Sequence, residues 1–273
     1  MIIEYSARSH VGMVRENNED NLYVDGIALA PNVRECPFAI DGTTSFPAIF
    51  AVCDGIGGEE NGEVASLLAI QTLMNFDRRI KEATSESFGD IIQLYVNEVG
   101  AAIHLEPNNA KKRTGTTLAL AAISKNGVYC FNLGDSRIYS LQRSAFRQIT
   151  NDHTLAAEQM KNGFSTKEQA EGAKNLNKLT RCIGIGDMPI VEKYPPIIGK
   201  CRILICSDGL TDMVSASEIE NILRASERTA DAANSLLSST LENGGQDNVT
   251  VIIIDMKASK RSFFRSLVKK LKG

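Results

Sequence analysis

The stretch FAVCDGIGGEENGEVAS, residues 50–66, contains the strongest local signal for the fold. An apolar run from Phe50 to Cys53 stops at Asp54, a glycine cluster and two glutamates follow, and a helical pattern begins. A strand, a glycine-rich turn and a helix in this order are typical of loops that bind phosphate. This stretch lacks their key residues. Glu60 stands where a dinucleotide-binding loop has its third glycine, and no lysine followed by Ser or Thr is present.

The chemistry of this turn suits a cation better than a phosphate. Glu59 and Glu60 would repel an anion at the start of the helix. Mg²⁺ and Mn²⁺ take carboxylate and carbonyl oxygens as ligands, which Asp54 and the backbone of Gly55 can supply. Asp and Gly are also common in simple turns. The stretch by itself therefore leaves a metal site and a plain turn equally open.

The composition indicates a folded cytoplasmic protein. The chain has 273 residues, of which 43% are hydrophobic, so it can bury a sizeable core. The six cysteines show no CxxC pairing, which favours buried, reduced thiols over zinc or disulfides. No apolar run approaches the ~20 residues of a membrane span. The first residues show no secretion signal. We therefore expect a cytoplasmic location.

Charge is distributed unevenly along the chain. Residues 257–273 carry seven of the 30 Lys and Arg residues and none of the 33 Asp and Glu residues, so the remaining body has a net charge near −10. An acidic body argues against nucleic acid as a partner. The absence of tryptophan and the scarcity of other aromatic residues argue against a surface that stacks bases. A body of this kind fits a protein that gathers carboxylates around metal ions.

Two kinds of periodic segment are present. Strand-like runs cover residues 48–54, 116–123, 127–134, 136–142, 201–207 and 248–255, and helical patterns cover 62–79, 86–105, 152–163, 217–226 and 229–242. Strands and helices are grouped rather than strictly alternating, which favours an α+β layered sandwich.

Local signals refine this assignment. Asn126-Gly127 is a strong hairpin signal, so residues 116–142 are predicted to form an antiparallel meander. Ser217 and Glu220 fit a capping box at the start of the fourth helix. Residues 25–47 are predicted to form a loop or hairpin.

Acidic residues recur at the ends of the predicted strands. Asp54, Asp135 and Asp208 follow apolar runs, Asp247 precedes one, and Glu19-Asp20 forms a fifth acidic site. Each alone is more readily explained as a turn or cap residue. Neighbouring strands would nevertheless place several carboxylates at one sheet edge, and carboxylates so close repel one another unless a cation binds them. Oxygen ligands of this kind select Mg²⁺ or Mn²⁺ over zinc.

The motifs that carry these acids resemble those of a known family. VGMVRENNEDN, FAVCDGIGG, GTTLALAAI, FNLGDSRIY, ITNDHTL, LTRCIG, LICSDGLTD and GGQDNVTVIII occur in the order found in the metal-dependent Ser/Thr protein phosphatases, the type 2C or PPM family, compact bacterial type. The resemblance covers about residues 6–255. It implies a four-layer α-β-β-α sandwich with a binuclear metal site at one end of the central β-sandwich.

The resemblance also implies roles for individual residues. Residues that match Asp54 bridge two Mn²⁺ or Mg²⁺ ions, those that match Asp208 and Asp247 hold the first ion, and the carbonyl that matches Gly55 holds the second. Residues like Glu19 and Asp20 support the second ion, partly through water. Asp135, together with Asp208, matches the site of a third, weaker ion. Arg15 matches the arginine that binds the substrate phosphate. Asn248 matches a residue that does not bind the ions itself but supports the residues that do.

The implied reaction is hydrolysis of phosphoserine and phosphothreonine in proteins. Two ions ~3.5–4 Å apart can share a water and lower its pKa, and the resulting hydroxide attacks phosphorus in line without a covalent enzyme intermediate. Arg15 would pair with two phosphate oxygens. The implied partners are phosphorylated Ser/Thr proteins and a cognate bacterial-type Ser/Thr kinase.

Alternative functions can be weighed on the same residues. A partner-switching regulator that acts on one dedicated phosphoprotein often lacks the arginine, so Arg15 favours the general enzyme. A catalytically weak phosphoprotein-binding module would have lost metal aspartates, but Asp54, Asp208 and Asp247 are present. The acidic body weighs against a metal-dependent nuclease.

Two positions depart from the family pattern or match it ambiguously. Ile56 stands where eukaryotic members often have a histidine that helps to protonate the leaving group. His153, in NDHT, matches a family position, and we interpret it as structural. Residues 154–180 match the variable flap beside the metals.

We expect residues 1–256 to form the phosphatase catalytic domain and residues 257–273 a separate tail. On a helix the tail would place two phenylalanines and three aliphatic residues on one face and basic residues on the other, which is typical of an interfacial helix. It therefore predicts peripheral contact with anionic membrane or an acidic partner; a solubilising, unstructured end is an equal alternative.

Overall fold

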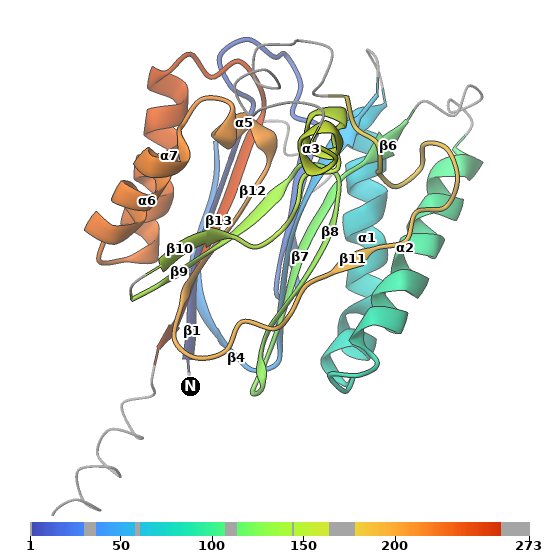
Figure 1. The fold of residues 1–273 in the computed structure, drawn as a ribbon, viewed down its shortest axis with the longest axis horizontal. Coiled ribbons are helices and arrows are strands. Elements are labelled where there is room, and N and C mark those ends of the chain that lie inside the picture. Colours follow the sequence, from blue (N-terminus) through green and yellow to red (C-terminus); the bar gives the residue numbers. More distant parts are fainter. Residues whose placement is uncertain are drawn as a thin grey trace, which may run out of the picture.

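Two antiparallel β-sheets lie face to face, and helices cover both outer faces (Figure 1). The computed structural model describes residues 2–29, 37–57, 61–106, 114–143, 145–163 and 178–257. The predicted α-β-β-α sandwich is confirmed. In the described residues, no helix is both long enough and apolar enough to cross a membrane.

The first sheet has the strand order β10-β9-β12-β13-β1-β4. Its strands are β1 (Ile2–His10), β4 (Phe38–Ser45), β9 (Arg137–Gln142), β10 (Ala145–Gln148), β12 (Arg202–Cys206) and β13 (Val249–Lys257). Helices α6 (Ala216–Ala225) and α7 (Thr229–Glu242) cover its outer face.

The second sheet has the order β11-β8-β7-β5-β2-β3, with β6 paired to β5. Its strands are β2 (Asp20–Val24), β3 (Ile27–Ala28), β5 (Ala48–Ile56), β6 (Gly115–Thr116), β7 (Leu118–Ser124), β8 (Gly127–Leu133) and β11 (Glu192–Lys193). Helices α1 (Gly62–Lys81) and α2 (Phe88–Leu105) cover it, and the short helices α3 (Leu155–Lys161) and α5 (Asp208–Thr211) lie at one end of the sandwich (Figure 1).

The apolar runs are continuous because both faces of each sheet are buried. In β5, Ile49, Ala51 and Cys53 face the core under α1 and α2. Ala48, Phe50 and Val52 point the other way, into the core between the sheets. Strand β13 repeats this arrangement between the central core and the core under α6 and α7. The sequence stretch that begins at residue 50 therefore builds two of the three apolar layers.

The hairpin at Asn126-Gly127 is confirmed, since Ser124 pairs with Gly127 at the end of β7 and β8. The longer meander over residues 116–142 is wrong. Strand β9 leaves its neighbour β8 and pairs with β12 in the opposite sheet. The chain crosses at Gly134, whose φ of +99° favours glycine.

Two smaller predictions also differ from the structure. The N-cap of α6 is Ser215, whose hydroxyl accepts from the N–H of Glu218, so the cap lies two residues before the predicted Ser217. Residues 25–47 do not form one hairpin. Strand β3 pairs with β2, whereas β4 pairs with β1 in the other sheet. Residues 30–36 lie outside the described part.

Candidate metal centre

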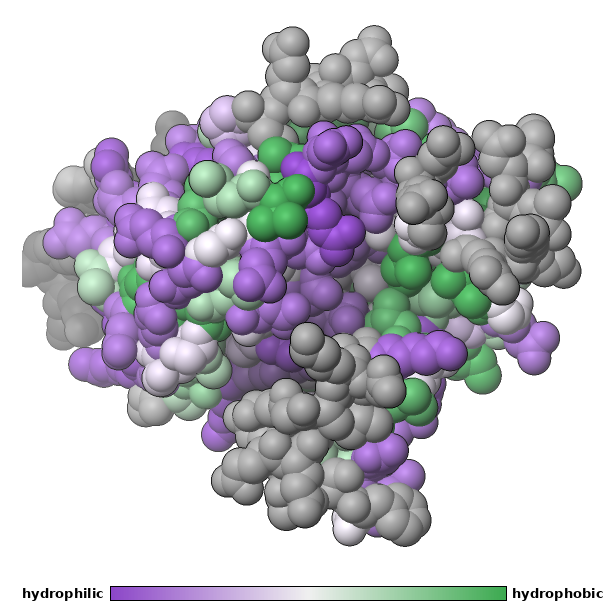
Figure 2. Space-filling view, turned by 90° about the horizontal axis from the view of Figure 1, so that it is seen from above, coloured by the Kyte–Doolittle hydropathy of each residue, from purple (hydrophilic) through white to green (hydrophobic). Residues whose placement is uncertain are grey.

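The predicted acidic residues gather at the end of the sandwich where α3 and α5 lie (Figure 1). Asp20 begins β2 and stands directly opposite Asp54 in β5. Asp208 begins α5, immediately after β12, and Asp135 follows β8 across the turn at Gly134. Asp247 lies just before β13. Seen from above, the middle of this end is mostly hydrophilic (Figure 2).

Asp20 is buried with one oxygen satisfied and one not. Its Oδ2 accepts a hydrogen bond of 2.7 Å from the hydroxyl of Ser207. Its Oδ1 is buried without a hydrogen-bond partner. Burial, together with the nearby Asp208 and Asp247, raises the pKa of Asp20 to about 7. A buried carboxylate oxygen without a donor is costly unless a cation occupies the space in front of it.

Asp54 and Asp208 lie close enough to influence the pKa values of each other. Burial and then the neighbouring Asp20 and Asp208 raise the pKa of Asp54 well above its usual range. Burial, followed by Asp212 and Asp247, raises the pKa of Asp208 to about 6. The two groups thus behave as a pair that strongly resists carrying two negative charges.

Asp135 lies beside this pair and is subject to the same field. Burial and then Asp208 raise its pKa to about 8. The guanidinium of Arg137 partly opposes this rise, but it is bound to Asp152 at 2.6 Å. Asp135 and Asp208 also line a cavity of about 480 Å³ whose opposite wall is formed by Ala156 and Met160 around α3.

Backbone groups hold the Asp54-Gly55 turn in place. The N–H of Asp54 donates to the hydroxyl of Thr117, and the N–H of Gly55 donates to the carbonyl of Glu19 at 3.1 Å. A Cβ on Gly55 would lie 2.1 Å from the carbonyl oxygen of Gly62, so only glycine fits. This packing fixes the position of the Gly55 carbonyl that the sequence proposes as a ligand.

Asn248 joins the Glu19 loop to the start of β13. Its Oδ1 accepts from the N–H of Glu19 at 2.8 Å, and its Nδ2 donates to the carbonyls of Val11 and Asn17, both at 2.8 Å. The side chain of Glu19 is half-buried, and burial and then the charge of Glu63 raise its pKa. Asn248 therefore organises the loop without carrying charge itself.

Arg15 is half-exposed and forms an ion pair with Asp247. Its Nη2 lies 2.7 Å from Oδ2 of Asp247, and the other oxygen of Asp247 accepts from the N–H of Asn248. The pair places the predicted phosphate-binding arginine at the rim of the carboxylate group. Among the described residues, the structure shows a hydrogen bond to Asp247 at one end of the guanidinium.

The side chains that could bind a metal ion here are all carboxylates, and hard cations prefer such oxygen ligands. One of these oxygens, Oδ1 of Asp20, is buried and has no hydrogen-bond partner. Within the described ranges, no group of three or more His, Cys, Asp or Glu side chains is arranged so that it could hold a metal ion. The structure shows separate contacts instead, Asp20 with Ser207 and Asp247 with Arg15. The predicted acids are thus brought to one place, while their ligand roles stay predictions.

Sequence reasoning missed the hydroxyl groups that support these acids. Ser207 donates to Asp20 and accepts from the N–H of Thr250. Thr117 accepts from Asp54 and shares a hydrogen bond of 2.7 Å with Ser136. Ser207 and Ser136 each adjoin a predicted aspartate, and this adjacency was the only available signal.

Comparisons with known proteins agree with this geometry. A family profile described as protein phosphatase 2C matches residues 37–243. A protein from Listeria welshimeri named serine/threonine phosphatase Stp is 32% identical over 252 residues, which are 91% of this chain and 94% of that protein.

Solved structures are similar over most of the chain. The crystal structure of the Mycobacterium tuberculosis serine/threonine phosphatase PstP/Ppp has a TM-score of 0.75 at 29% identity, over 94% of this chain and 100% of that one. A structure of the catalytic domain of PstP in complex with two manganese ions has a TM-score of 0.73 at 30% identity, over 93% of this chain and 99% of that one. On the family profile and the Listeria relative together, the chain belongs to the protein phosphatase 2C family.

Proposed function

We propose that this chain is a Mn²⁺- or Mg²⁺-dependent protein phosphatase that hydrolyses phosphoserine and phosphothreonine. The observation that carries the proposal is one group of carboxylates, the buried Asp20 and the half-buried Asp54, Asp135 and Asp208, whose pKa values rise because of desolvation and then because of the charge of their neighbours. The relatives named Ser/Thr phosphatases and the two manganese ions in the PstP structure support the same activity.

The residues divide into three groups around the ions. Asp54 would contact both ions, and Asp208 and Asp247 would complete the binding of the first. The carbonyl of Gly55 would hold the second ion, with Glu19 and Asp20 supporting it. Asp135 and Asp208 together would bind a third, weaker ion. When bound, these ions supply the charge that lowers the pKa of a water and offsets the phosphate charge.

The chain itself orients the substrate through Arg15. Its planar guanidinium can donate two parallel hydrogen bonds to a phosphate. The contact with Asp247 fixes one edge of the guanidinium and so limits the entropy lost when phosphate binds. The side chain of Ile56 can hold no proton, so it cannot protonate the leaving oxygen.

The first test is phosphate release from a phosphothreonine peptide, with Mn²⁺ and with chelator, for the wild-type chain, Asp208→Asn and Asp231→Asn. Asp231 is a matched control because it lies on the surface of α7 in an ion pair with Arg228. We expect Mn²⁺-dependent release that is lost in Asp208→Asn and retained in Asp231→Asn. Folded wild-type protein that releases no phosphate with any metal would favour the phosphoprotein-binding alternative.

We also infer that a Ser/Thr kinase supplies the substrates, since hydrolysis requires proteins phosphorylated on those residues. We propose residues 1–256 as the catalytic domain. The predicted tail lies almost entirely outside the described residues, and its contact with membrane stays a prediction. Sedimentation with anionic liposomes, compared between the full chain and residues 1–256, tests it; equal failure to bind would remove it.

A further inference from the structure

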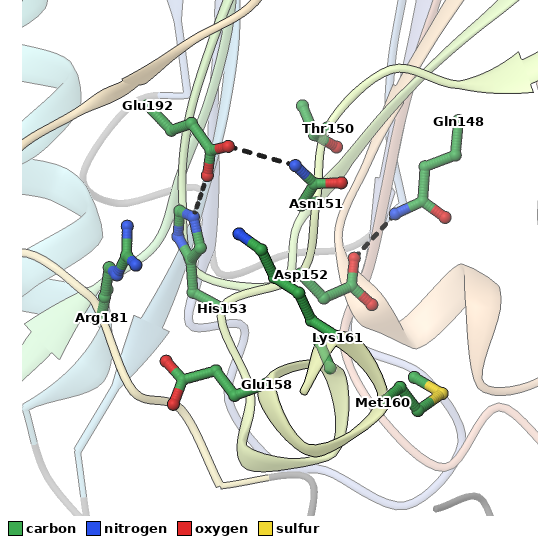
Figure 3. Close-up of a pocket in the computed structure, with 11 residues that line it drawn as sticks. Gln148, Thr150, Asn151, Asp152, His153, Glu158, Met160, Lys161, Arg181 and Glu192 are labelled. Atoms are coloured by element: carbon green, nitrogen blue, oxygen red, sulfur yellow. Dashed lines mark hydrogen bonds and ion pairs between the residues drawn. The ribbon is translucent and has the colours of Figure 1, made fainter. Parts of the chain in front are cut away.

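His153 is a buried histidine that the proposed reaction does not use. Its side chain is 4% exposed, and it lies two residues before α3. It lines a cavity of about 470 Å³ next to Asn151 and Glu192 (Figure 3). A buried imidazole with hydrogen bonds at both ring nitrogens is held in one orientation.

The two bonds of the ring determine its tautomer. Nδ1 accepts the backbone N–H of Gly134 at 3.1 Å, so Nδ1 carries no proton. Nε2 then carries the proton and donates it to Oε2 of Glu192 at 2.6 Å. The other oxygen of Glu192 accepts from Asn151 at 3.1 Å, which fixes the carboxylate in turn (Figure 3). Glu192 therefore keeps Nδ1 free to accept.

Gly134 is the residue before Asp135, and His153 forms hydrogen bonds with both its backbone N–H and its backbone carbonyl. The backbone N–H of His153 donates to the carbonyl of Gly134 at 3.0 Å, in addition to the bond at Nδ1. Gly134 also packs tightly against Thr117, since a Cβ on Gly134 would lie 2.6 Å from the methyl group of Thr117. Thr117 is the residue whose hydroxyl accepts from Asp54. The turn that carries Asp135 therefore contacts His153 and also Thr117, the residue that is hydrogen-bonded to Asp54.

The same residue anchors the segment that follows α3. The carbonyl of His153 accepts from the N–H of Thr180 at 2.8 Å, and the carbonyl of Lys178 accepts from the N–H of Leu155 at 3.0 Å. The start and the end of segment 154–180 therefore meet at His153.

We propose that His153 is a positioning residue for Asp135, and that Glu192 serves by holding the His153 tautomer. The inference rests on the proposed function. Through Nδ1 the ring fixes the turn at Gly134, so that the Asp135 carboxylate faces Asp208 with its backbone already ordered. Residues of this kind, one step behind a metal ligand, typically change metal affinity or activity by about 10-fold to 100-fold when altered.

Two substitutions separate this role from simple packing. The carboxamide oxygen of His153→Asn can take the place of Nδ1 and accept from Gly134, but it loses Glu192. The carboxamide of His153→Gln can take the place of Nε2 and reach Glu192, but it leaves the N–H of Gly134 without an acceptor. His104→Asn is the matched control, because His104 is a half-buried histidine bonded to the carbonyl of Gly184.

The experiment measures Mn²⁺ binding by titration calorimetry, melting temperature with chelator, and the Mn²⁺ concentration for half-maximal hydrolysis of a phosphothreonine peptide. We expect His153→Gln to weaken the weakest Mn²⁺ binding step by about 10-fold or more. His153→Asn and His104→Asn should stay within about 3-fold of wild type, well short of that loss.

Equal Mn²⁺ responses in His153→Asn and His153→Gln would overturn the proposal, whatever their melting temperatures. A wild-type chain that binds Mn²⁺ and hydrolyses the peptide, with both variants unchanged, refutes the positioning role alone. A folded wild-type chain that does neither refutes the proposed function and this role together.

Discussion

Two sets of acidic residues in this protein have opposite surroundings. Away from the metal centre, Asp255 meets Arg202 at 2.8 Å. Asp41 meets Arg8, which lowers the pKa of Asp41. In the described part of the chain, no Lys or Arg forms an ion pair with Asp20, Asp54, Asp135 or Asp208. Basic residues of the chain neutralise the first set. The second set has no such partners, and we propose that bound metal ions neutralise it.

We propose that the acids without a basic partner serve cation binding rather than stability. Acids paired with a basic residue stabilise the fold, whereas acids that lie close to one another destabilise it until a cation binds. Functional sites commonly reduce stability in this way. Each set therefore has its own expected response to mutation.

The largest effect is expected for Asp54→Asn. Because both ions would lose their shared ligand, kcat/KM for a phosphothreonine peptide should fall on the order of 1,000-fold, more than the loss of a supporting residue causes. With chelator present, the same change should raise Tm by about 2–4 °C, because it removes a charge from a repelling pair. Activity assays and calorimetry on the same sample test both. A lower Tm with chelator would break the comparison.

Arg202→Met tests the paired set. The change leaves Asp255 buried without its partner and removes the donor to the carbonyls of Leu223 and Ser226. Unfolding in urea should show a loss of about 3–5 kcal/mol, with unchanged kcat for the folded fraction. Arg224→Met, which breaks a surface pair with Glu220, is the control and should cost less than about 1 kcal/mol.

Arg15→Ala should reduce kcat/KM about 10-fold to 100-fold, through loss of charge-assisted hydrogen bonds to phosphate. The stability of the fold should hardly change, because Arg15 is half-exposed. Arg15→Lys restores the charge but not the planar fork, so it should recover only part of the loss. Full recovery by lysine would mean that charge alone matters at this position.

The last prediction concerns pH. In the folded chain, burial raises the pKa values of Asp208, Asp20 and Asp135 to about 6, about 7 and about 8. The folded state therefore binds more protons than the unfolded state above about pH 4, so the free energy of unfolding falls as pH rises towards about pH 8. Thermal unfolding with chelator across this range measures the slope. Asp20→Asn should flatten it, and saturating Mn²⁺ should reverse its sign.

The sequence predicted the central strands well because they are buried on both faces and therefore continuously apolar. Strand β1 was missed because polar residues on it face helix α7 and β13. Ser6 bonds Thr229, Arg8 bonds Asn234 and Ser9 bonds Thr250. Such partners lie more than two hundred residues away, and no local pattern reveals them.

In the metal centre, too, some features could be predicted from the sequence and others could not. Asp54 and Asp208 stand out because each ends an apolar run and precedes a glycine. Thr117 supports Asp54 because β5 pairs with β6 and β7, whereas the turn at Gly134 depends on the crossing of the chain from β8 to β9, which the hairpin signal did not predict. Residue types with strong local chemistry were predictable, whereas the contacts that orient them depend on which strands become neighbours.

The pairing of β1 with β13 has a consequence for synthesis of the protein. Ile2 lies opposite Lys257 and His10 opposite Val249, so the middle of the first sheet joins the earliest and latest strands described. During translation, β1 cannot pair with β13 until β13 has left the ribosome. Asp247 and Asn248, which directly precede β13, arrive in the same step. With the role proposed for Asp247, a nascent chain would complete its metal centre only when β13 pairs with β1, and an unfinished chain would not hydrolyse phosphoproteins.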